Sequence, residues 1–175
     1  SDDNRSCQLL EVVDLPPADA HLLSLHNIPP LPPELAVGDC LDDYLIEQEI
    51  QINARSHLYL VRDKHDGQTY VLKTPSVNLS DDLDALHAFQ REDWIGQRFH
   101  HPDIVKTISS SRPRHYLYLV QEYLDGLSLR SWRKHNPDAP VETIIGFAKP
   151  AIKALRALHR RETLHQDVKP DNFFI

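Results

Sequence analysis

The stretch His165-Gln166-Asp167-Val168-Lys169-Pro170-Asp171-Asn172 decides how this chain of 175 residues is expected to fold. It follows a helix-like segment and leads into the apolar residues 173–175, so we expect a loop between a helix and a short strand. A carboxylate, an ammonium group and a carboxamide lie close together within it. Such groups can orient a hydroxyl, stabilise developing negative charge and bind a hard cation. The stretch therefore predicts a loop that carries chemistry, and a polar loop with a plain turn at Lys169-Pro170 is the alternative.

The pattern His-x-Asp-x-Lys-Pro-x-Asn resembles the catalytic loop of serine/threonine protein kinases. This resemblance implies that Asp167 orients the acceptor hydroxyl and takes its proton, and that Lys169 stabilises the phosphoryl group during transfer. It also implies that Asn172 is a ligand of Mg²⁺. Lys169 followed by Pro170 favours a serine or threonine acceptor over tyrosine. The same pair disfavours a small-molecule phosphotransferase, which usually lacks it.

Upstream of this loop, strand-like and helix-like segments follow in the order that protein kinases show. Strands are expected at 44–50, 57–64, 68–74, 105–110 and 115–123. Helices are expected at 81–99 with Ser80 as the N-cap, from about Ser128, and at 141–160. The resemblance implies a protein-kinase-like fold of the α+β class over residues 44–175. It comprises an antiparallel five-stranded N-terminal lobe with its C helix, then the first helices and catalytic loop of a truncated C-terminal lobe.

Lys73 ends an apolar run, and Glu92 lies on the apolar face of the helix expected at 81–99. A carboxylate on such a face needs a partner, because an unpaired buried charge is costly. The resemblance supplies that partner: Lys73 would bind the α- and β-phosphates of ATP and pair with Glu92 of the C helix. The alternatives are a lysine at a sheet edge and a solvated glutamate.

The resemblance also assigns an ATP site, but the phosphate-binding loop departs from the family. Its three glycine positions fall at Gln51, Asn53 and Ser56. Glycine lets the backbone approach phosphate closely and adopt positive φ, which asparagine tolerates better than glutamine or serine. We therefore expect a weaker grip on phosphate, or one made by side chains such as that of Arg55. The remaining residues assigned to ATP are Ile50, Leu58, Val71, Glu122 and Leu124, the last two through backbone groups.

The N-terminal quarter of the chain has a different character. Residues 1–14 contain Asp3-Asn4 before a strand-like run, which resembles the closing motif of metal-dependent serine/threonine protein phosphatases. The resemblance would make Asp3 a ligand of Mn²⁺ or Mg²⁺, and an ordinary turn is the alternative. Residues 15–43 carry three Pro-Pro pairs, which predict a stiff linker. A phosphatase end, a linker and a kinase domain in this order resemble bacterial fusion proteins with both activities.

Composition limits the partners and the compartment. A net charge of −7 argues against nucleic acid as the main partner, and no apolar run reaches the length of a membrane-spanning helix. The two cysteines, Cys7 and Cys40, make no disulfide framework. We therefore expect free thiols in the reducing environment of the cytoplasm.

Together these patterns predict ATP-dependent phosphorylation of serine or threonine in a protein substrate, assisted by Mg²⁺ or Mn²⁺. The alternative is a pseudokinase that acts as an ATP- or partner-binding scaffold, which the altered phosphate loop favours. The chain has no methionine and ends just after the catalytic loop, so we expect it to be internal to a longer polypeptide. We expect residues 1–175 alone to be inactive, because the metal-binding Asp-Phe-Gly motif would follow Ile175.

Overall fold

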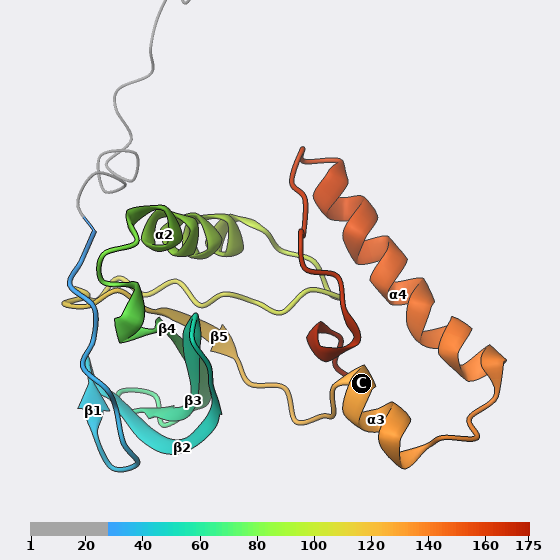
Figure 1. The fold of residues 1–175 in the computed structure, drawn as a ribbon, viewed down its shortest axis with the longest axis horizontal. Helices are drawn as coiled ribbons and strands as arrows, with labels where there is room; N and C mark the ends of the chain where they lie inside the picture. Colours follow the sequence, from blue (N-terminus) through green and yellow to red (C-terminus); the bar gives the residue numbers. More distant parts are fainter. Residues whose placement is uncertain (1–27) are drawn as a thin grey trace, which may run out of the picture.

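The computed structural model describes residues 28–175, whose arrangement is shown in Figure 1. A five-stranded antiparallel sheet has the order β1-β2-β3-β4-β5. Its strands are β1 (Cys40–Leu41), β2 (Tyr44–Ile52), β3 (Ser56–Asp63), β4 (Thr69–Pro75) and β5 (Leu119–Glu122). The helices are α2 (Leu83–Arg98), α3 (Leu129–His135) and α4 (Val141–His159), with 3₁₀ turns η1 (Val77–Leu79) and η2 (Pro170–Asn172). The expectations for residues 1–27, including a metal ligand at Asp3, lie outside the described residues.

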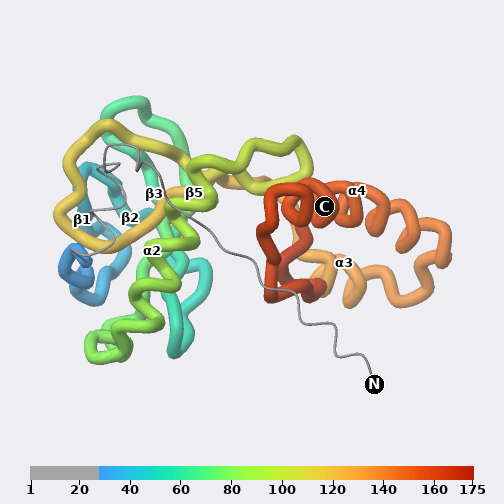
Figure 2. Tube along the Cα trace, turned by 90° about the horizontal axis from the view of Figure 1, so that it is seen from above, coloured from blue at the N-terminus to red at the C-terminus, as the bar shows by residue number. Residues whose placement is uncertain are grey.

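The elements form two groups that lie side by side (Figure 2). The sheet and α2 make the first group, and α3, α4 and the C-terminal segment make the second. After β5, residues 123–128 carry the chain from the first group to the second. The expected order of a sheet with one helix, followed by further helices, is thereby confirmed. No helix within residues 28–175 is long and apolar enough to cross a membrane.

The sheet has five strands, as expected, but one of them is not the strand that the sequence indicated. Residues 105–110 form no strand: Thr107 makes only an isolated bridge with Gln121, and the Ile108 N–H donates to the Val120 carbonyl at 2.8 Å. The fifth strand is β1, which pairs with β2 through a two-residue turn. Both turn residues, Asp42 and Asp43, have positive φ (44° and 72°), the conformation that short hairpins require. Aspartate signals such a turn more weakly than glycine does, so the sequence did not indicate this hairpin.

The described end of the segment expected as a linker is packed against the sheet. Leu35 and Leu41 are buried in the core that the sheet forms with Tyr59, Val61 and other residues. Burial of a leucine stabilises by about 1.5–3 kcal/mol, so these contacts hold residues 35–41 on the lobe. The packed unit therefore starts upstream of Tyr44.

A partly buried ion pair joins the end of β3 to the loop before β5. The Arg112 guanidinium binds both carboxylate oxygens of Asp63, with Nη1 2.9 Å from Oδ1, and its Nη2 donates to the Tyr44 hydroxyl at 2.8 Å. Burial of Asp63 would raise the pKa of its carboxyl group. The hydrogen bonds from Arg112 and from the His65 N–H, together with the positive charge of Arg112, outweigh that effect, so the pKa of Asp63 is lowered.

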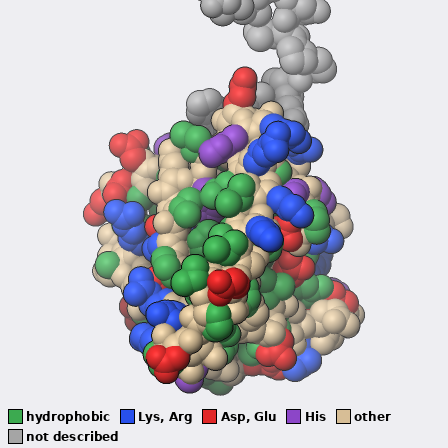
Figure 3. Space-filling model, turned by 90° about the vertical axis from the view of Figure 1, so that its right-hand side faces the viewer, with side chains coloured by type: hydrophobic (Ala, Val, Ile, Leu, Met, Phe, Trp, Pro, Cys, Tyr) green, Lys and Arg blue, Asp and Glu red, His purple; other side chains and the backbone are tan. Residues whose placement is uncertain are grey.

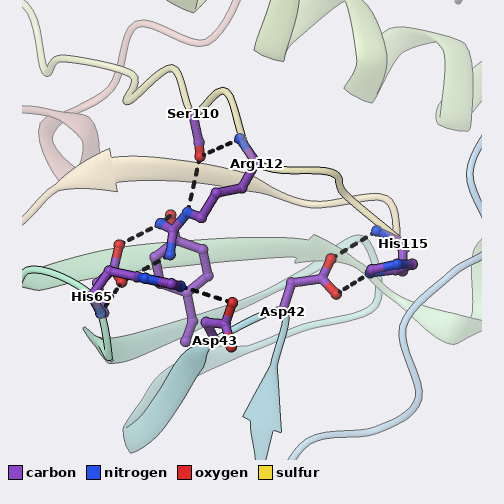
Figure 4. A network of polar contacts seen from close by, with 8 residues as sticks. Asp42, Asp43, His65, Ser110, Arg112 and His115 are labelled. Atoms are coloured by element: carbon purple, nitrogen blue, oxygen red, sulfur yellow. Dashed lines mark hydrogen bonds and ion pairs between the residues drawn. The ribbon is translucent and has the colours of Figure 1, made fainter.

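Two histidine–aspartate contacts tie the β1–β2 turn into the same network (Figure 4). Asp42 accepts a hydrogen bond from the His115 N–H at 2.8 Å, and its other oxygen lies 2.8 Å from the ring Nδ1 of His115. Asp43 lies 3.0 Å from Nε2 of His65. The two aspartates that make the turn therefore also connect it to two other loops.

The helices confirm the expected segments with small changes at their ends. α2 starts three residues after the expected cap Ser80, because the Asp82 carboxylate accepts from the Ala85 N–H at 3.0 Å and caps the helix instead. α3 starts after the expected cap Ser128. α4 leaves apolar side chains exposed to solvent. Figure 3 shows the side of the molecule that lies at the right of Figure 1, and hydrophobic side chains gather along the middle of this face. Ile145 and Ile152 are more than half exposed.

Candidate active site

The stretch from His165 to Asn172 folds into a turn closed by hydrogen bonds. Gln166 has φ +61°, in the left-handed region that residues other than glycine seldom occupy. This conformation directs the Asp167 N–H back to His165, whose carbonyl oxygen and Nδ1 accept at 2.8 and 3.3 Å. Asn172 donates through Nδ2 to the Asp167 carbonyl oxygen at 2.8 Å. The loop thus fixes the backbone on both sides of Asp167.

Three side chains that the sequence assigned to catalysis or metal binding meet at Asp167. Lys169 Nζ lies 2.8 Å from Asp167 Oδ2, and Asn172 Nδ2 donates to the same oxygen at 2.9 Å. The hydrogen bond from Lys169, and then that from Asn172, lowers the pKa of Asp167, so its carboxylate is charged at neutral pH. Both contacts use Oδ2, which leaves Oδ1 as the oxygen that can receive a substrate hydroxyl. Asp167 is well exposed, so a macromolecular substrate can reach it.

α3 anchors this loop through contacts that the sequence analysis did not foresee. Arg130 Nε lies 2.6 and 2.7 Å from the two carboxylate oxygens of Asp171. The backbone of Leu127 exchanges two hydrogen bonds of 3.0 Å with Ile175. A Cβ at Gly126 would lie 2.7 Å from the Ile175 carbonyl oxygen, so only glycine permits this approach. An arginine on a short helix carries no local sequence signal of a partner 41 residues away, which explains why Arg130 was missed.

Lys73 and Glu92 form the ion pair that the resemblance implied. Lys73 Nζ lies 2.6 and 2.8 Å from the two oxygens of Glu92, and 5.7 Å from the centre of the Phe89 ring. The expectation that Glu92 needs this partner because it is buried was wrong, since its side chain is 46% exposed. A half-exposed pair contributes only about 0.2–1 kcal/mol to stability. Other contacts must therefore hold α2 where the pair can form.

The β2–β3 loop, where the phosphate-binding loop was expected, is closed by a side chain. Asn53 Oδ1 accepts from the Arg55 and Ser56 N–H groups, each at 2.9 Å, and the Asn53 N–H donates to the Ser56 carbonyl at 3.2 Å. None of Gln51, Asn53 and Ser56 has positive φ, so the loop does not use the glycine conformation. Two amides that could face phosphate are hydrogen-bonded to Asn53 instead. The weaker binding of phosphate by this loop stays a prediction.

The remaining residues assigned to ATP lie on the sheet and at its exit. Leu58 and Lys73 are paired across β3 and β4, and Val71 lies two residues before Lys73, so these three side chains share one face of the sheet. Ile50 lies at a register irregularity of β2 and is exposed. Glu122 ends β5, where its N–H donates to the Lys106 carbonyl at 2.9 Å. Leu124 follows in the exposed segment that leads to α3. The structure therefore places these positions around one face of the sheet and the connection between the two groups.

In this chain an antiparallel sheet is joined to one helix by a lysine–glutamate ion pair, and a helical part with an Asp-Lys-Asn loop follows. This arrangement defines a protein-kinase-like fold. Residues 46–175 match the family described as protein kinase domain, and the chain belongs to this family. Members of the family generally use ATP and Mg²⁺.

Named relatives support the same assignment. The chain is 27% identical over 135 residues to the probable serine/threonine-protein kinase PknB of Lactococcus lactis, covering 77% of this chain and 22% of that protein. It is 26% identical over 140 residues to a probable serine/threonine-protein kinase of Clostridium acetobutylicum, covering 79% of this chain and 21% of that protein. The crystal structure of the Mycobacterium tuberculosis PknI kinase domain matches with a TM-score of 0.68 and 26% identity, over 81% of this chain and 57% of that one. The chain thus spans about a fifth of the length of these curated relatives.

Proposed function

We propose that the protein transfers the γ-phosphate of ATP to serine or threonine hydroxyls of a protein substrate. The observation that carries this proposal is the meeting of Asp167, Lys169 and Asn172 in one hydrogen-bonded loop. Kinship with proteins named serine/threonine-protein kinases supports the choice of acceptor. The Lys73–Glu92 pair supports the choice of a nucleotide as donor, because a lysine held in this way can meet the phosphates.

In this proposal each residue acts through the contacts described above. Asp167 Oδ1 accepts the hydrogen bond of the substrate hydroxyl and turns its oxygen toward the phosphorus. The lowered pKa of Asp167 keeps the carboxylate charged, so it can orient the hydroxyl and receive its proton as the bond to phosphorus forms. Lys169 lies at the same carboxylate and stabilises negative charge on the transferred group.

The residues present fit Mg²⁺ bound together with ATP. Asn172 uses its Nδ2 within the loop, which leaves its Oδ1 as the carboxamide oxygen that can ligate a hard cation. Within residues 28–175 there is no cluster of three or more histidine, cysteine, aspartate or glutamate residues able to hold a metal ion. Mg²⁺ needs no such cluster, because it is commonly bound by one or two protein groups and substrate phosphates. When bound, the ion would neutralise charge on the phosphates.

Three finer assignments belong to the same proposal. We place the kinase domain at 44–175, the linker at 15–43 and the end of a phosphatase-like domain at 1–14, with Asp3 as a ligand of Mn²⁺ or Mg²⁺. The support is the sequence resemblance and, for the linker, the proline pairs; the described part of that linker packs against the kinase lobe. We also place the reaction in the cytoplasm, where ATP is supplied.

The test compares two variants of the full-length gene product, incubated with labelled ATP and an acceptor protein. Asp167→Asn should lower transfer by about 10²–10⁴-fold and leave ATP affinity unchanged, since asparagine can hold a hydroxyl but cannot take its proton. Lys73→Met should weaken both ATP binding and transfer. Lys134→Met, which removes an exposed lysine on α3, is the matched control and should change neither.

The outcomes separate the candidate functions. Label found on serine or threonine of the acceptor, and lost in Asp167→Asn, supports the proposal. ATP binding that depends on Lys73 without any transfer by the wild type would point to a scaffold. Full transfer by Asp167→Asn would show that this loop does not carry the reaction.

A further inference from the structure

Residues 28–35, which we call the strap, run from beside α2 to the sheet (Figure 1). Ile28 and Leu31 pack against an apolar cluster that lies between α2 and β5. This cluster contains Leu86 and Phe89, which are the two buried residues of α2. The strap therefore contacts α2 at the residues by which that helix is attached to the sheet.

The strap is fixed independently of α2 at two points. The Pro30 carbonyl accepts a hydrogen bond from the Leu117 N–H at 2.9 Å, and Leu35 is buried in the separate core on the sheet. Two Pro-Pro pairs, at 29–30 and 32–33, restrict the backbone between and around these points. Leu31 lies between the two anchors. It is thus held in place by contacts that do not involve the helix against which it packs.

The buried face of α2 is directly linked to the ion pair of the proposed active site. Phe89 and Glu92 are three residues apart and so share one side of the helix. The Phe89 ring lies beside the Lys73 ammonium group, 5.7 Å from its centre. A shift of α2 at Phe89 would therefore move Glu92 relative to Lys73. The pair itself is half exposed and too weak to prevent such a shift.

We propose that Ile28 and Leu31 are positioning residues, which hold α2 in the orientation that brings Glu92 to Lys73. The strap is then a support of the active site and not a spacer. This inference rests on the proposed kinase function for its effect on turnover, whereas its effect on α2 can be measured without any activity. Truncation of Leu31 should reduce the population of the paired orientation, and with it the turnover, by about tenfold.

The experiment compares Leu31→Ala with Leu35→Ala in the full-length gene product. Both remove the same atoms from the same strap, but Leu35 packs on the sheet core and Leu31 on the α2 cluster. Thermal unfolding should show a lower Tm for both. Only Leu31→Ala should lower kcat by about tenfold and speed amide hydrogen exchange across residues 83–98. Leu31→Met, which refills the volume, should restore both readouts.

Two results would overturn the inference. The first is a Leu31→Ala protein whose α2 exchanges as slowly as that of Leu35→Ala. The second is an equal loss of kcat in both variants at equal Tm, which would show a general effect of stability. If the wild type transfers no phosphate, the proposed function fails, and the exchange of α2 alone then decides for or against the strap.

Discussion

Gly96 offers the sharpest test of how α2 is held, because the helix touches the segment before β5 at this residue. A Cβ built at Gly96 would clash with the Thr107 hydroxyl, and it would lie 3.0 Å from the Thr107 Cβ and 3.5 Å from its Cγ2. Thr107 is buried, so its side chain has little room to turn away. Gly96→Ala should therefore push α2 away from residues 105–108.

Two opposing effects set the change in the free energy of unfolding that Gly96→Ala causes. Alanine in a helix interior is favoured over glycine by about 1 kcal/mol. Overpacking of a well-filled site costs about 1–3 kcal/mol, and the clash with the hydroxyl of the buried Thr107 argues for about 2–3 kcal/mol. The net loss for Gly96→Ala is then about 1–2 kcal/mol, equivalent to a fall in Tm of roughly 2–8 °C for a chain of this size.

A double-mutant cycle measures this clash directly. Thr107→Ala removes the hydroxyl and the methyl group that the new Cβ would meet, so it should relieve most of the strain in the Gly96→Ala background. Urea unfolding of the four proteins should give a favourable coupling energy of about 1–2 kcal/mol, against the ~0.5 kcal/mol expected of independent sites. A Gly96→Ala protein that is more stable than the wild type, or single effects that simply add, would refute the contact.

Three further predictions concern the phosphate loop, the polar network and the C-terminal segment. Asn53→Gly frees two loop amides and should tighten ATP in a calorimetric titration; equal or weaker binding would mean that the Asn53 side chain contributes to the contact. Arg112→Met leaves Asp63 buried without its partner and should lower the free energy of unfolding by about 3 kcal/mol. Because the pKa of Asp63 is lowered in the folded state, the ionised Asp63 stabilises the wild type fully above its unfolded pKa of about 4, and this contribution is lost as the pH falls through the folded pKa. Urea denaturation between pH 3 and 7 should therefore show a free energy of unfolding that falls toward pH 3 in the wild type, and a smaller fall in Arg112→Met. Gly126→Ala should displace the backbone near Ile175 and lower Tm, whereas an unchanged Tm would show that the segment can adjust.

The sequence predicted those parts of the structure whose signals are local. Hydrophobic patterning located β2, β3, β4, α2 and α4, and the Asp-x-Lys-Pro-x-Asn spacing brought Asp167, Lys169 and Asn172 together. The ion pair of Lys73 with Glu92 followed from family resemblance, although the burial argument offered for it was wrong. Resemblance succeeded there because it carries information on contacts between distant segments.

The features that the sequence did not predict depend on tertiary contacts or on unusual backbone conformations. β1 forms because two adjacent aspartates adopt positive φ, a state that His115 and His65 support from other loops. Residues 105–110 have a strand-like composition, yet they make only an isolated bridge with β5. The proline pairs of the segment expected as a linker predict a stiff chain. Proline content, however, does not indicate whether the neighbouring leucines pack against a surface; Leu31 packs against the cluster at α2, and Leu35 is buried in the core at the sheet.

The position of α2 connects the two groups of elements. The strap contacts the buried face of α2, and Thr107 contacts α2 at Gly96. The C-terminal end of α2 contacts the segment after α4: Arg161 donates to the Arg98 carbonyl at 3.3 Å and lies over the Phe99 ring. Lys73 depends on α2 through Glu92, while residue 161 lies only a few positions before the loop that holds Asp167. A displacement of α2 would therefore be transmitted to both sets of functional groups. This is why variants at Leu31 and Gly96, which lie outside the proposed active site, should change turnover as well as stability.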